Sequence, residues 1–309
     1  MYKRILVPLD TSKLAEIALP YAKELAVKLG SEVILIHVRT LADTPDNLDH
    51  RVYISKMAAT VEQDMKKSPD LPRGEEVKVK SAVIGSPSLL THPAEEILNY
   101  AEKENVSLIV MATHGRTGIR RWALGDTTNK VTRVSKTPIL LIRASSGVPE
   151  SVHLDNVLVP LDGSKQSEAV LAYIENLASK LKTSISLLNI VEPLYHIYPS
   201  YDGMGYYGGS GIVRIPYTDE ELKPLKEVAE KYVKSVSDKL TDLGIKASYE
   251  VKVGSPDEEI IKTEEEIRPN IVAMSTHGHS GFGRWNHGSI ADKVLHHGNT
   301  PLLLVRPKQ

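Results

Sequence analysis

Residues Ile271–Val294, IVAMSTHGHSGFGRWNHGSIADKV, decide the fold because they combine three kinds of local structure in one short stretch. The stretch opens with an apolar run typical of a buried strand and continues into a loop that contains Gly278, Gly281 and Gly283. Gly288-Ser289 then begins an amphipathic segment. Glycines let backbone N–H groups approach a ligand closely, and a helix start offers unpaired donors and the positive end of a dipole. The stretch therefore predicts a strand, an anion-binding loop and a helix, with phosphate as the favoured anion.

The same pattern occurs a second time in the chain. Residues Leu108–Val131, LIVMATHGRTGIRRWALGDTTNKV, match it at a constant offset of 163, so that Thr113 corresponds to Thr276 and Gly125 to Gly288. A repeat of this kind indicates two copies of one structural unit, and 309 residues are enough for two domains with their own cores. We expect domain 1 at residues 1–144, a linker at 145–152 and domain 2 at 153–309, and we call the two copies unit one and unit two.

The composition narrows the class of protein. Hydrophobic residues make up 41% of the chain, and 38 basic residues balance 39 acidic ones, so no strong field attracts nucleic acid or anionic lipid. The absence of cysteine excludes disulfides and cysteine-ligated zinc. The first ten residues, MYKRILVPLD, lack a long apolar segment, and no run of about 18 apolar residues occurs. We expect a cytoplasmic protein that binds neither nucleic acid nor membrane.

Each unit alternates apolar runs of strand type with amphipathic helical segments. Strands are expected at 4–9, 33–38, 77–84, 108–112 and 139–142 in unit one, and at 157–161, 185–190, 246–253, 271–275 and 302–305 in unit two. The first helix is expected to be capped by Thr11 or Ser12, kinked by Pro20 and closed by Gly30. Such alternation predicts right-handed crossovers and an α/β fold with a doubly wound parallel sheet in each unit.

Two segments break the repeat. Unit two inserts residues 193–217, which hold six of the 13 tyrosines. This composition is compatible with a long ordered loop or lid, and equally with an aromatic subunit contact. Unit one carries six extra residues, Ser88 to Pro93, between its third strand and the next helix.

The expected topology places a ligand site at the carboxyl ends of the strands, where the strand order reverses. Pro160-Leu161-Asp162 ends the first strand of unit two and Met274-Ser275 ends the fourth. If these strands are neighbours, both ends border one site, where Asp162 can accept hydrogen bonds from ribose hydroxyls or an adenine amino group. The alternative interpretation is that Asp10 and Asp162 only cap the first helix or its turn.

The order of these motifs resembles the universal stress protein family over nearly the whole chain twice, as in its tandem members. Nucleotide-binding members of that family share Gly-x-x-Gly, nine residues, and then Gly followed by Ser or Thr. Unit two reads Ser275 to Gly278, nine residues, and Gly288-Ser289, with one departure. Unit one reads Ala112 to Gly115, nine residues, and Gly125-Asp126, with two departures.

The resemblance implies a five-stranded parallel sheet of order 3-2-1-4-5 in each unit, helices on both faces, and binding of ATP or a related adenine nucleotide with Mg²⁺ held through the phosphate oxygens. The implied nucleotide-binding residues of unit two, the preferred site, are Pro160, Asp162, Ile190, Gly254, Met274, Ser275, His277, Gly278, Gly288, Ser289, Ile290 and Ala291. The corresponding residues of unit one are Asp10, Val38, Gly85, Met111, His114, Gly115, Arg116, Gly125, Asp126, Thr127 and Thr128.

Asp126 makes the two units unequal. As an N-cap it stabilises the helix by about 1 kcal/mol, but its carboxylate competes for the donors that a phosphate needs. Two like charges about 4 Å apart repel by about 4 kcal/mol at an effective dielectric near 20, or about three decades of affinity, of which Arg116 offsets a part. We expect unit two to bind the nucleotide. Unit one binds it weakly, binds a less charged ligand, or serves as a structural partner.

No nucleophile elbow, P-loop or His-Glu-x-x-His motif is present, so an enzyme is not expected beyond slow ATP hydrolysis or autophosphorylation. The expected function is a nucleotide-dependent switch in a stress response, acting on an unidentified protein partner. The closing strands are expected to pair within the chain as a pseudo-dimer, and a homodimer is also expected.

Two alternatives stay open. One is a metal-binding protein, which uses the histidines of unit two: His277, His279, His287, His296 and His297. The other is a structural or interaction module that binds no nucleotide.

Overall fold

The computed structural model describes residues 1–39, 47–72, 74, 76–85, 92–113, 124–143, 149, 152–200, 211–276 and 289–307. Unit one contains β1 (Arg4–Pro8), α1 (Lys13–Glu16), α2 (Ala18–Leu29), β2 (Glu32–Arg39), α3 (Asn47–Lys66), β3 (Val79–Gly85), α4 (Pro93–Lys103), β4 (Leu108–Ala112), α5 (Asp126–Val134) and β5 (Ile139–Ile142). Unit two contains β6 (Asn156–Pro160), η1 (Ser167–Val170), α6 (Leu171–Leu181), β7 (Ser184–Val191), β8 (Tyr195–Ser200), β9 (Gly211–Pro216), α7 (Asp219–Asp242), β10 (Ala247–Val253), α8 (Pro256–Ile267), β11 (Ile271–Ser275), α9 (Ser289–His297) and β12 (Leu302–Val305). The expected linker lies almost entirely outside the described residues.

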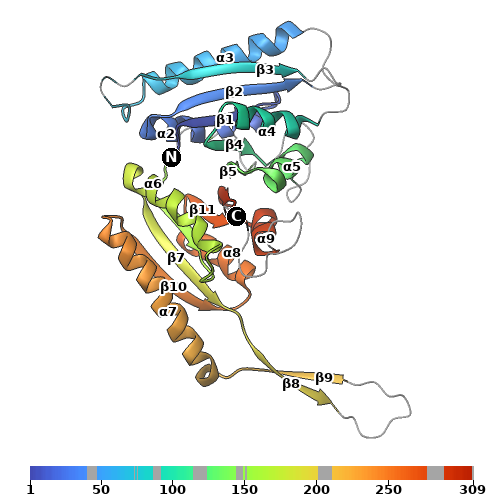
Figure 1. Cartoon of the computed structure of the whole chain (residues 1–309), viewed down its shortest axis with the longest axis vertical. Coiled ribbons are helices and arrows are strands. Elements are labelled where there is room, and N and C mark those ends of the chain that lie inside the picture. The colour runs from blue at the N-terminus through green and yellow to red at the C-terminus, as the bar shows by residue number, and fades with distance from the viewer. Residues whose placement is uncertain are drawn as a thin grey trace, which may run out of the picture.

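One ten-stranded sheet runs through both units in the order β10-β7-β6-β11-β12-β5-β4-β1-β2-β3 (Figure 1). Within each unit the five strands are parallel and follow the order 3-2-1-4-5, which confirms the predicted fold class. The two halves join where β5 and β12 pair antiparallel, with Leu141 opposite Leu302 and Ile139 opposite Leu304. The closing strands therefore protect each other's edges, and the tandem units form the expected pseudo-dimer within one chain.

The helical segment after the first strand begins with a separate short turn in each unit, α1 in unit one and η1 in unit two. In unit one, the Ser12 side chain accepts the N–H of Ala15 as N-cap, α1 ends at Glu16, and α2 ends at Gly30 in the left-handed conformation. Pro20 lies four residues after Glu16, whose carbonyl a proline cannot accommodate in a continuous helix. Unit two has no such proline, yet its helix also begins with a separate turn, η1. The interruption therefore belongs to the fold, and Pro20 is compatible with it.

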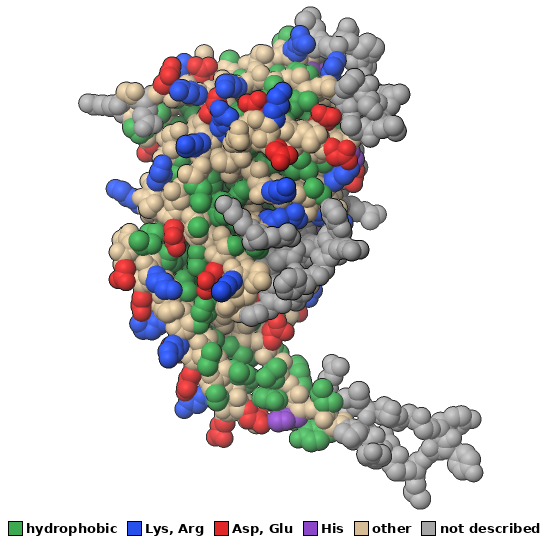
Figure 2. Space-filling model, in the orientation of Figure 1, with side chains coloured by type: hydrophobic (Ala, Val, Ile, Leu, Met, Phe, Trp, Pro, Cys, Tyr) green, Lys and Arg blue, Asp and Glu red, His purple; other side chains and the backbone are tan. Residues whose placement is uncertain are grey.

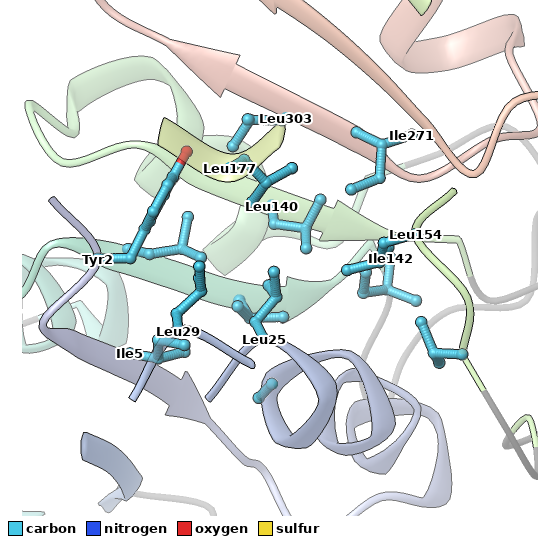
Figure 3. Close-up of a cluster of buried hydrophobic side chains, with 14 of the residues drawn as sticks. Tyr2, Ile5, Leu25, Leu29, Leu140, Ile142, Leu154, Leu177, Ile271 and Leu303 are labelled. Atoms are coloured by element: carbon cyan, nitrogen blue, oxygen red, sulfur yellow. The ribbon is translucent and has the colours of Figure 1, made fainter. Parts of the chain in front are cut away.

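The hydrophobic core is continuous across the two units (Figure 3). Buried side chains of α2 and β5 in unit one pack in the same cluster as Leu177 of α6 and Leu303 of β12 in unit two. Tyr2 crosses the boundary directly, because its hydroxyl donates to the Tyr173 carbonyl at 3.1 Å and the two rings meet edge to face. Separating the units would therefore expose apolar surface as well as two strand edges.

A pair of arginines ties the units together reciprocally. Arg143 follows β5 and donates to the carbonyls of Val294 (2.8 Å) and Leu295 at the carboxyl end of α9. Arg306 follows β12, 163 residues later, and donates to the last carbonyls of α5. Each guanidinium thus donates to carbonyls in the last turn of a helix of the other unit, and its positive charge faces the negative end of the helix dipole. The Val294 carbonyl also accepts the Gly298 N–H at 2.9 Å.

The insertion of unit two forms an antiparallel two-stranded ribbon, β8–β9, in which Tyr195 pairs with Pro216 and Tyr198 with Val213. The sequence analysis expected a loop, a lid or a contact surface and did not predict strands. The ribbon is a sheet of its own and extends away from the body of the molecule (Figure 1).

Candidate functional site

The carboxyl ends of the first and fourth strands of each unit meet at the same edge of the sheet. In unit two, β6 pairs with β11, with Val157 opposite Ile271, so Pro160 and Met274 end neighbouring strands. In unit one, β1 and β4 pair in the same way. The strand order reverses at these two positions, as expected for the ligand site of a doubly wound sheet.

Both aspartates after the first strand build a turn. Asp10 Oδ1 accepts the backbone N–H of Ser12 at 3.0 Å and its hydroxyl at 2.6 Å, and Asp162 Oδ1 accepts the N–H of Ser164 at 2.9 Å. The residue after each aspartate has a positive φ, which is 70° at Thr11 and 82° at Gly163. Both aspartates therefore form hydrogen bonds within the turn, and their contact with a ligand stays a prediction.

Two polar side chains that the sequence analysis missed fix this turn from the neighbouring strand. His37 of β2 contacts the Leu9 carbonyl through Nδ1 at 2.9 Å, and Asn189 of β7 donates to the Leu161 carbonyl at 2.7 Å. Both are buried and occupy corresponding positions in the two units. A polar residue at the same place in the second strand of both units was the signal that could have found them.

Gly85 and Gly254 end the third-strand region, and each lies beneath a side chain. A Cβ on Gly85 would come within 2.1 Å of Arg39 Nη2, and one on Gly254 within 2.7 Å of Glu259 Cγ. A larger residue at either position therefore requires the flexible side chain above it to move. The covering group is a guanidinium in unit one and a carboxylate-bearing side chain in unit two, so the two sites differ in charge here.

Val38 and Ile190, at the ends of the second strands, are half-buried, and Met111 and Met274, at the ends of the fourth, are buried. They place apolar side chains at the edge where the resemblance puts the adenine. Ser275 follows Met274 and is also buried. Its hydroxyl oxygen has no hydrogen-bond partner among the described residues, whereas the corresponding residue of unit one is Ala112.

The start of α5 differs from the expectation. Gly125 is the N-cap and Asp126 is the first helical residue, so Asp126 is not the N-cap that the sequence predicted. Because the N-cap is a glycine, no side chain accepts a hydrogen bond from the first N–H groups of α5 at that position. Asp126 Oδ2 instead lies 2.7 Å from Nε2 of His92. His92 Nδ1 accepts the N–H of Ala94 as the N-cap of α4, so Nε2 carries the proton and donates to the Asp126 carboxylate. The extra segment of unit one thus supplies a side chain that binds Asp126.

The other predicted site residues at the starts of α5 and α9 differ in burial, and one of them, Thr128, bonds to the sheet. Thr128 donates from its hydroxyl to the Ala112 carbonyl at 3.1 Å and is buried, whereas Thr127 is half-buried. In α9, Ser289 is exposed, Ile290 is half-buried and Ala291 is buried. The first residue of α9 therefore presents a small hydroxyl side chain to solvent where α5 presents a carboxylate.

The first turn of α8 contacts α9 through an ion pair. Lys293 Nζ lies 3.1 Å from Asp257 Oδ2, and Ser255 Oγ donates to Oδ1 of the same carboxylate at 2.8 Å. Burial favours the neutral acid, but the hydrogen bonds from Ser255 and Lys293 outweigh it and lower the pKa of Asp257. In unit one, Lys130 pairs with Glu95 at 2.7 Å in a similar place.

Six predicted site residues lie outside the described residues: His114, Gly115, Arg116, His277, Gly278 and Gly288. Three of the histidines proposed as metal ligands, at 277, 279 and 287, also lie outside them. Across the described segments, no group of three or more histidine, aspartate or glutamate side chains could hold a metal ion. Within the same segments, no helix has both the length and the apolar surface to cross a bilayer.

Comparison with known proteins identifies the family. The model of the universal stress protein family matches residues 1–143 and again 153–306, so the chain belongs to this family. YxiE of Bacillus subtilis (strain 168), a universal stress protein, is 32% identical over 148 residues, which cover 46% of this chain and all of YxiE. Universal stress protein MJ0577 of Methanocaldococcus jannaschii is 30% identical over 163 residues, covering 46% of this chain and 96% of the relative.

Solved structures of similar length share the tandem fold. A putative universal stress protein from Pseudomonas aeruginosa UCBPP-PA14 has a TM-score of 0.67 at 13% identity and covers 99% of this chain and 94% of its own. A universal stress protein from Archaeoglobus fulgidus DSM 4304 has a TM-score of 0.61 at 21% identity, with 99% of both chains covered. These identities support the fold alone.

Proposed function

We propose that unit two binds ATP, or a related adenine nucleotide, with Mg²⁺, and that the protein acts as a nucleotide-dependent switch in a stress response. The observation that carries the proposal is the contrast between the two last helices. Ser289 begins α9 with an exposed hydroxyl side chain, whereas Asp126 begins α5 with a carboxylate bound to His92. A phosphate at the start of α9 meets the positive end of a helix dipole and a hydroxyl in place of a carboxylate at the first helical residue. The acidic residue in the first turn of α9, Asp292, comes three residues later, and His296 lies 3.7 Å from its carboxylate.

The buried hydroxyl of Ser275 supports the same assignment. A buried polar atom without a partner costs about 1–3 kcal/mol, and a ligand that hydrogen-bonds to it recovers this cost. Ser275 lies at the end of β11, one residue after Met274. Its counterpart Ala112 offers no hydrogen bond, so the difference again favours unit two.

The geometry reduces the penalty expected for unit one. The Asp126 side chain is 88% exposed and also accepts a hydrogen bond from His92. Solvent therefore screens its charge, and the repulsion of a phosphate at about 4 Å falls toward about 1 kcal/mol, the value for bulk water. We accordingly expect unit one to bind the nucleotide about five- to tenfold more weakly than unit two, instead of the three decades estimated from the sequence.

Isothermal titration calorimetry with Mg-ATP tests the assignment. The wild-type protein is expected to show one stronger site. Ser289→Asp should weaken that site about five- to tenfold, whereas Asp126→Ser should strengthen the weaker one by a similar factor. Ser179→Asp, which adds the same charge at an exposed position on α6, is the matched control. Equal affinity in both units, or no effect of Ser289→Asp, contradicts the proposal.

The switch requires that the nucleotide change the protein. We expect Mg-ATP to raise the melting temperature and to slow proteolysis, because a ligand that binds only the folded state stabilises it. Catalysis is expected to be limited to slow ATP hydrolysis or autophosphorylation, both measured as ADP formation under single-turnover conditions and distinguished by whether the phosphate is released or stays on the protein. Unchanged stability and proteolysis at saturating nucleotide would remove the support for a switch.

A further inference from the structure

The ribbon β8–β9 and the first turns of α7 carry most of the exposed large hydrophobic side chains that the structure describes. The group comprises Leu194, Tyr195, Ile197, Tyr198 and Ile215 on the ribbon or at its base, and Leu225 and Val228 on α7. Ile197 is 67% exposed and Val228 is 70% exposed. Figure 2 shows hydrophobic side chains gathered where the ribbon leaves the body of the molecule. Apolar surface of this extent usually marks an interaction site.

The ribbon exposes apolar side chains on both of its faces. Side chains alternate along a strand, so Tyr195 and Ile197 lie on one face and Tyr198 lies on the other. Ile215 shares the face of Tyr198, because it pairs with His196 across the ribbon. A two-stranded ribbon is only marginally stable by itself in water. Its stability therefore requires a cover that is present whenever the chain is folded.

The base of the ribbon fixes its direction. His196 Nε2 contacts the Glu221 carboxylate at 2.8 Å, and the His196 ring stacks on Tyr217 with centroids 4.4 Å apart. Glu221 also closes the capping box of α7 with Thr218. The hydrogen bonds from Thr218 and His196 lower the pKa of Glu221, so this anchor is charged at neutral pH. The ribbon consequently projects away from its own α7 and leaves Leu225 and Val228 uncovered (Figure 1).

We propose that the ribbon of one copy packs on the first turns of α7 of a second copy, and that a twofold axis makes the exchange reciprocal. One chain carries both complementary surfaces: an apolar ribbon, and Leu225 and Val228 three residues apart on one side of a helix. A twofold pairing covers both at once on each copy. A second copy is the partner that is always available when the chain folds. Apart from His196, which contacts Glu221, and Arg214, which pairs across the ribbon with Ile197, the residues of β8 and β9 are uncharged, so the surface suits a largely apolar partner.

The edges of the main sheet support this choice. β5 and β12 pair with each other inside the chain, so neither is available for association between chains. The ribbon and α7 lie at the far end of unit two, away from that junction (Figure 1). The interface between copies therefore uses a surface that unit one, which lacks the ribbon insertion, does not have.

Sedimentation equilibrium tests the association. The wild-type protein is expected to be a dimer at micromolar concentration, and Ile197→Lys should weaken the dimer at least tenfold, because it places a charge in an apolar contact. Val52→Lys is the matched control: Val52 lies on α3 of unit one and is 58% exposed, and its substitution should leave the dimer intact. A wild-type monomer at 100 µM, or a dimer that Ile197→Lys does not weaken, overturns the proposal.

Crosslinking tests the arrangement without relying on a destabilising variant. The chain has no cysteine, so single-cysteine variants are specific probes. Ile197→Cys mixed with Val228→Cys should form a disulfide-linked heterodimer under mild oxidation, whereas Ile197→Cys mixed with Val52→Cys should not. Equal crosslinking in the two mixtures, or none in the first, rules out the ribbon-to-α7 contact.

Discussion

Unit one and unit two share their strand order but differ in the polar side chains that they bury at equivalent positions. Unit two leaves the Ser275 hydroxyl and one carboxylate oxygen of Glu264 buried without a partner among the described residues. Alanines occupy the corresponding positions in unit one, Ala112 and Ala101. Unit one also adds His92, which pairs with Asp126. Two copies of one fold can thus differ at single positions, and at Ser275 unit two keeps a hydroxyl that a ligand can use.

The largest effect is expected where the arginines join the units. Arg143→Ala should lower the free energy of unfolding by about 3 kcal/mol, because it removes a buried guanidinium and the donor that it supplies to the Leu295 carbonyl, while the Val294 carbonyl keeps the Gly298 N–H. Burial lowers the pKa of Arg143 to about 10, so the guanidinium is still charged at pH 7. Arg306→Ala, at the more exposed equivalent position, should cost about 1 kcal/mol. Urea unfolding measures the free energy of unfolding of both variants. Equal losses would show that Arg143 and Arg306 contribute equally to stability.

Glu264 should make the stability of unit two depend on pH. Its side chain is 4% exposed, and burial raises its pKa from 4.5 to about 7, although the Asn299 N–H and the Arg143 charge oppose the shift. Because the folded-state pKa lies above the unfolded value, the folded protein holds the proton between about pH 4.5 and 7, and stability is lost as the pH rises through this range.

Glu264→Gln should therefore raise the free energy of unfolding by about 2–3 kcal/mol at pH 8 and change it little at pH 4. The control is Glu265→Gln, an exposed neighbour on the same helix, which should not reproduce this pH dependence. Urea unfolding from pH 4 to pH 9 provides the measurement. A gain for Glu264→Gln that is the same at every pH would refute the proton linkage.

The N-caps of α4 and α8 should differ by a smaller amount. His92→Ala removes a side chain that accepts the Ala94 N–H, so it should destabilise the protein by about 1 kcal/mol. Ser255, the N-cap of α8, makes no such bond, and Ser255→Ala should cost only a few tenths of a kcal/mol. Thermal unfolding of the two variants measures the difference. A larger loss for Ser255→Ala would contradict the assignment of the caps.

The smallest effect is expected in the turn after the first strand. Thr11 has a φ of 70°, which is strained for a β-branched residue, whereas the equivalent Gly163 adopts 82° freely. Thr11→Gly should raise stability by about 0.5 kcal/mol, and Gly163→Thr should lower it by about 1 kcal/mol. Denaturant unfolding of both variants compares the units directly. If both substitutions destabilise, hydrogen bonding of Thr11 dominates over backbone strain.

The repeat made most of the fold predictable. Apolar runs of strand type and their offset located the ten strands of the main sheet to within about two residues, and the family resemblance supplied their order. The ribbon was missed because its tyrosines and glycines were taken as the signature of a loop. The β-branched and aromatic residues of Tyr195–Ser200 and Gly211–Pro216 were the available signal for strands.

The site was predictable in outline only. Motif spacing placed Met274, Ser275 and Ser289 at one edge of the sheet together with Asp162, and the pairing of β6 with β11 confirms that the strands carrying these motifs are neighbours. Contacts between residues distant in sequence could not be read from spacing. The His92–Asp126 hydrogen bond depends on how the start of α4 lies against the start of α5, and the crossing of Arg143 to α9 depends on how the two halves of the sheet pair.

Helix α9 spans the distance between two different environments. Its first residue, Ser289, borders the proposed nucleotide site of unit two. Two carbonyls near its carboxyl end accept hydrogen bonds from Arg143, which belongs to unit one. A short α-helix is stiff, so a displacement along its axis at one end also moves the other end. If a nucleotide at the proposed site displaces the start of α9, we expect the hydrogen bonds of Arg143 at the other end of the helix to change, which would couple unit one to ligand binding in unit two.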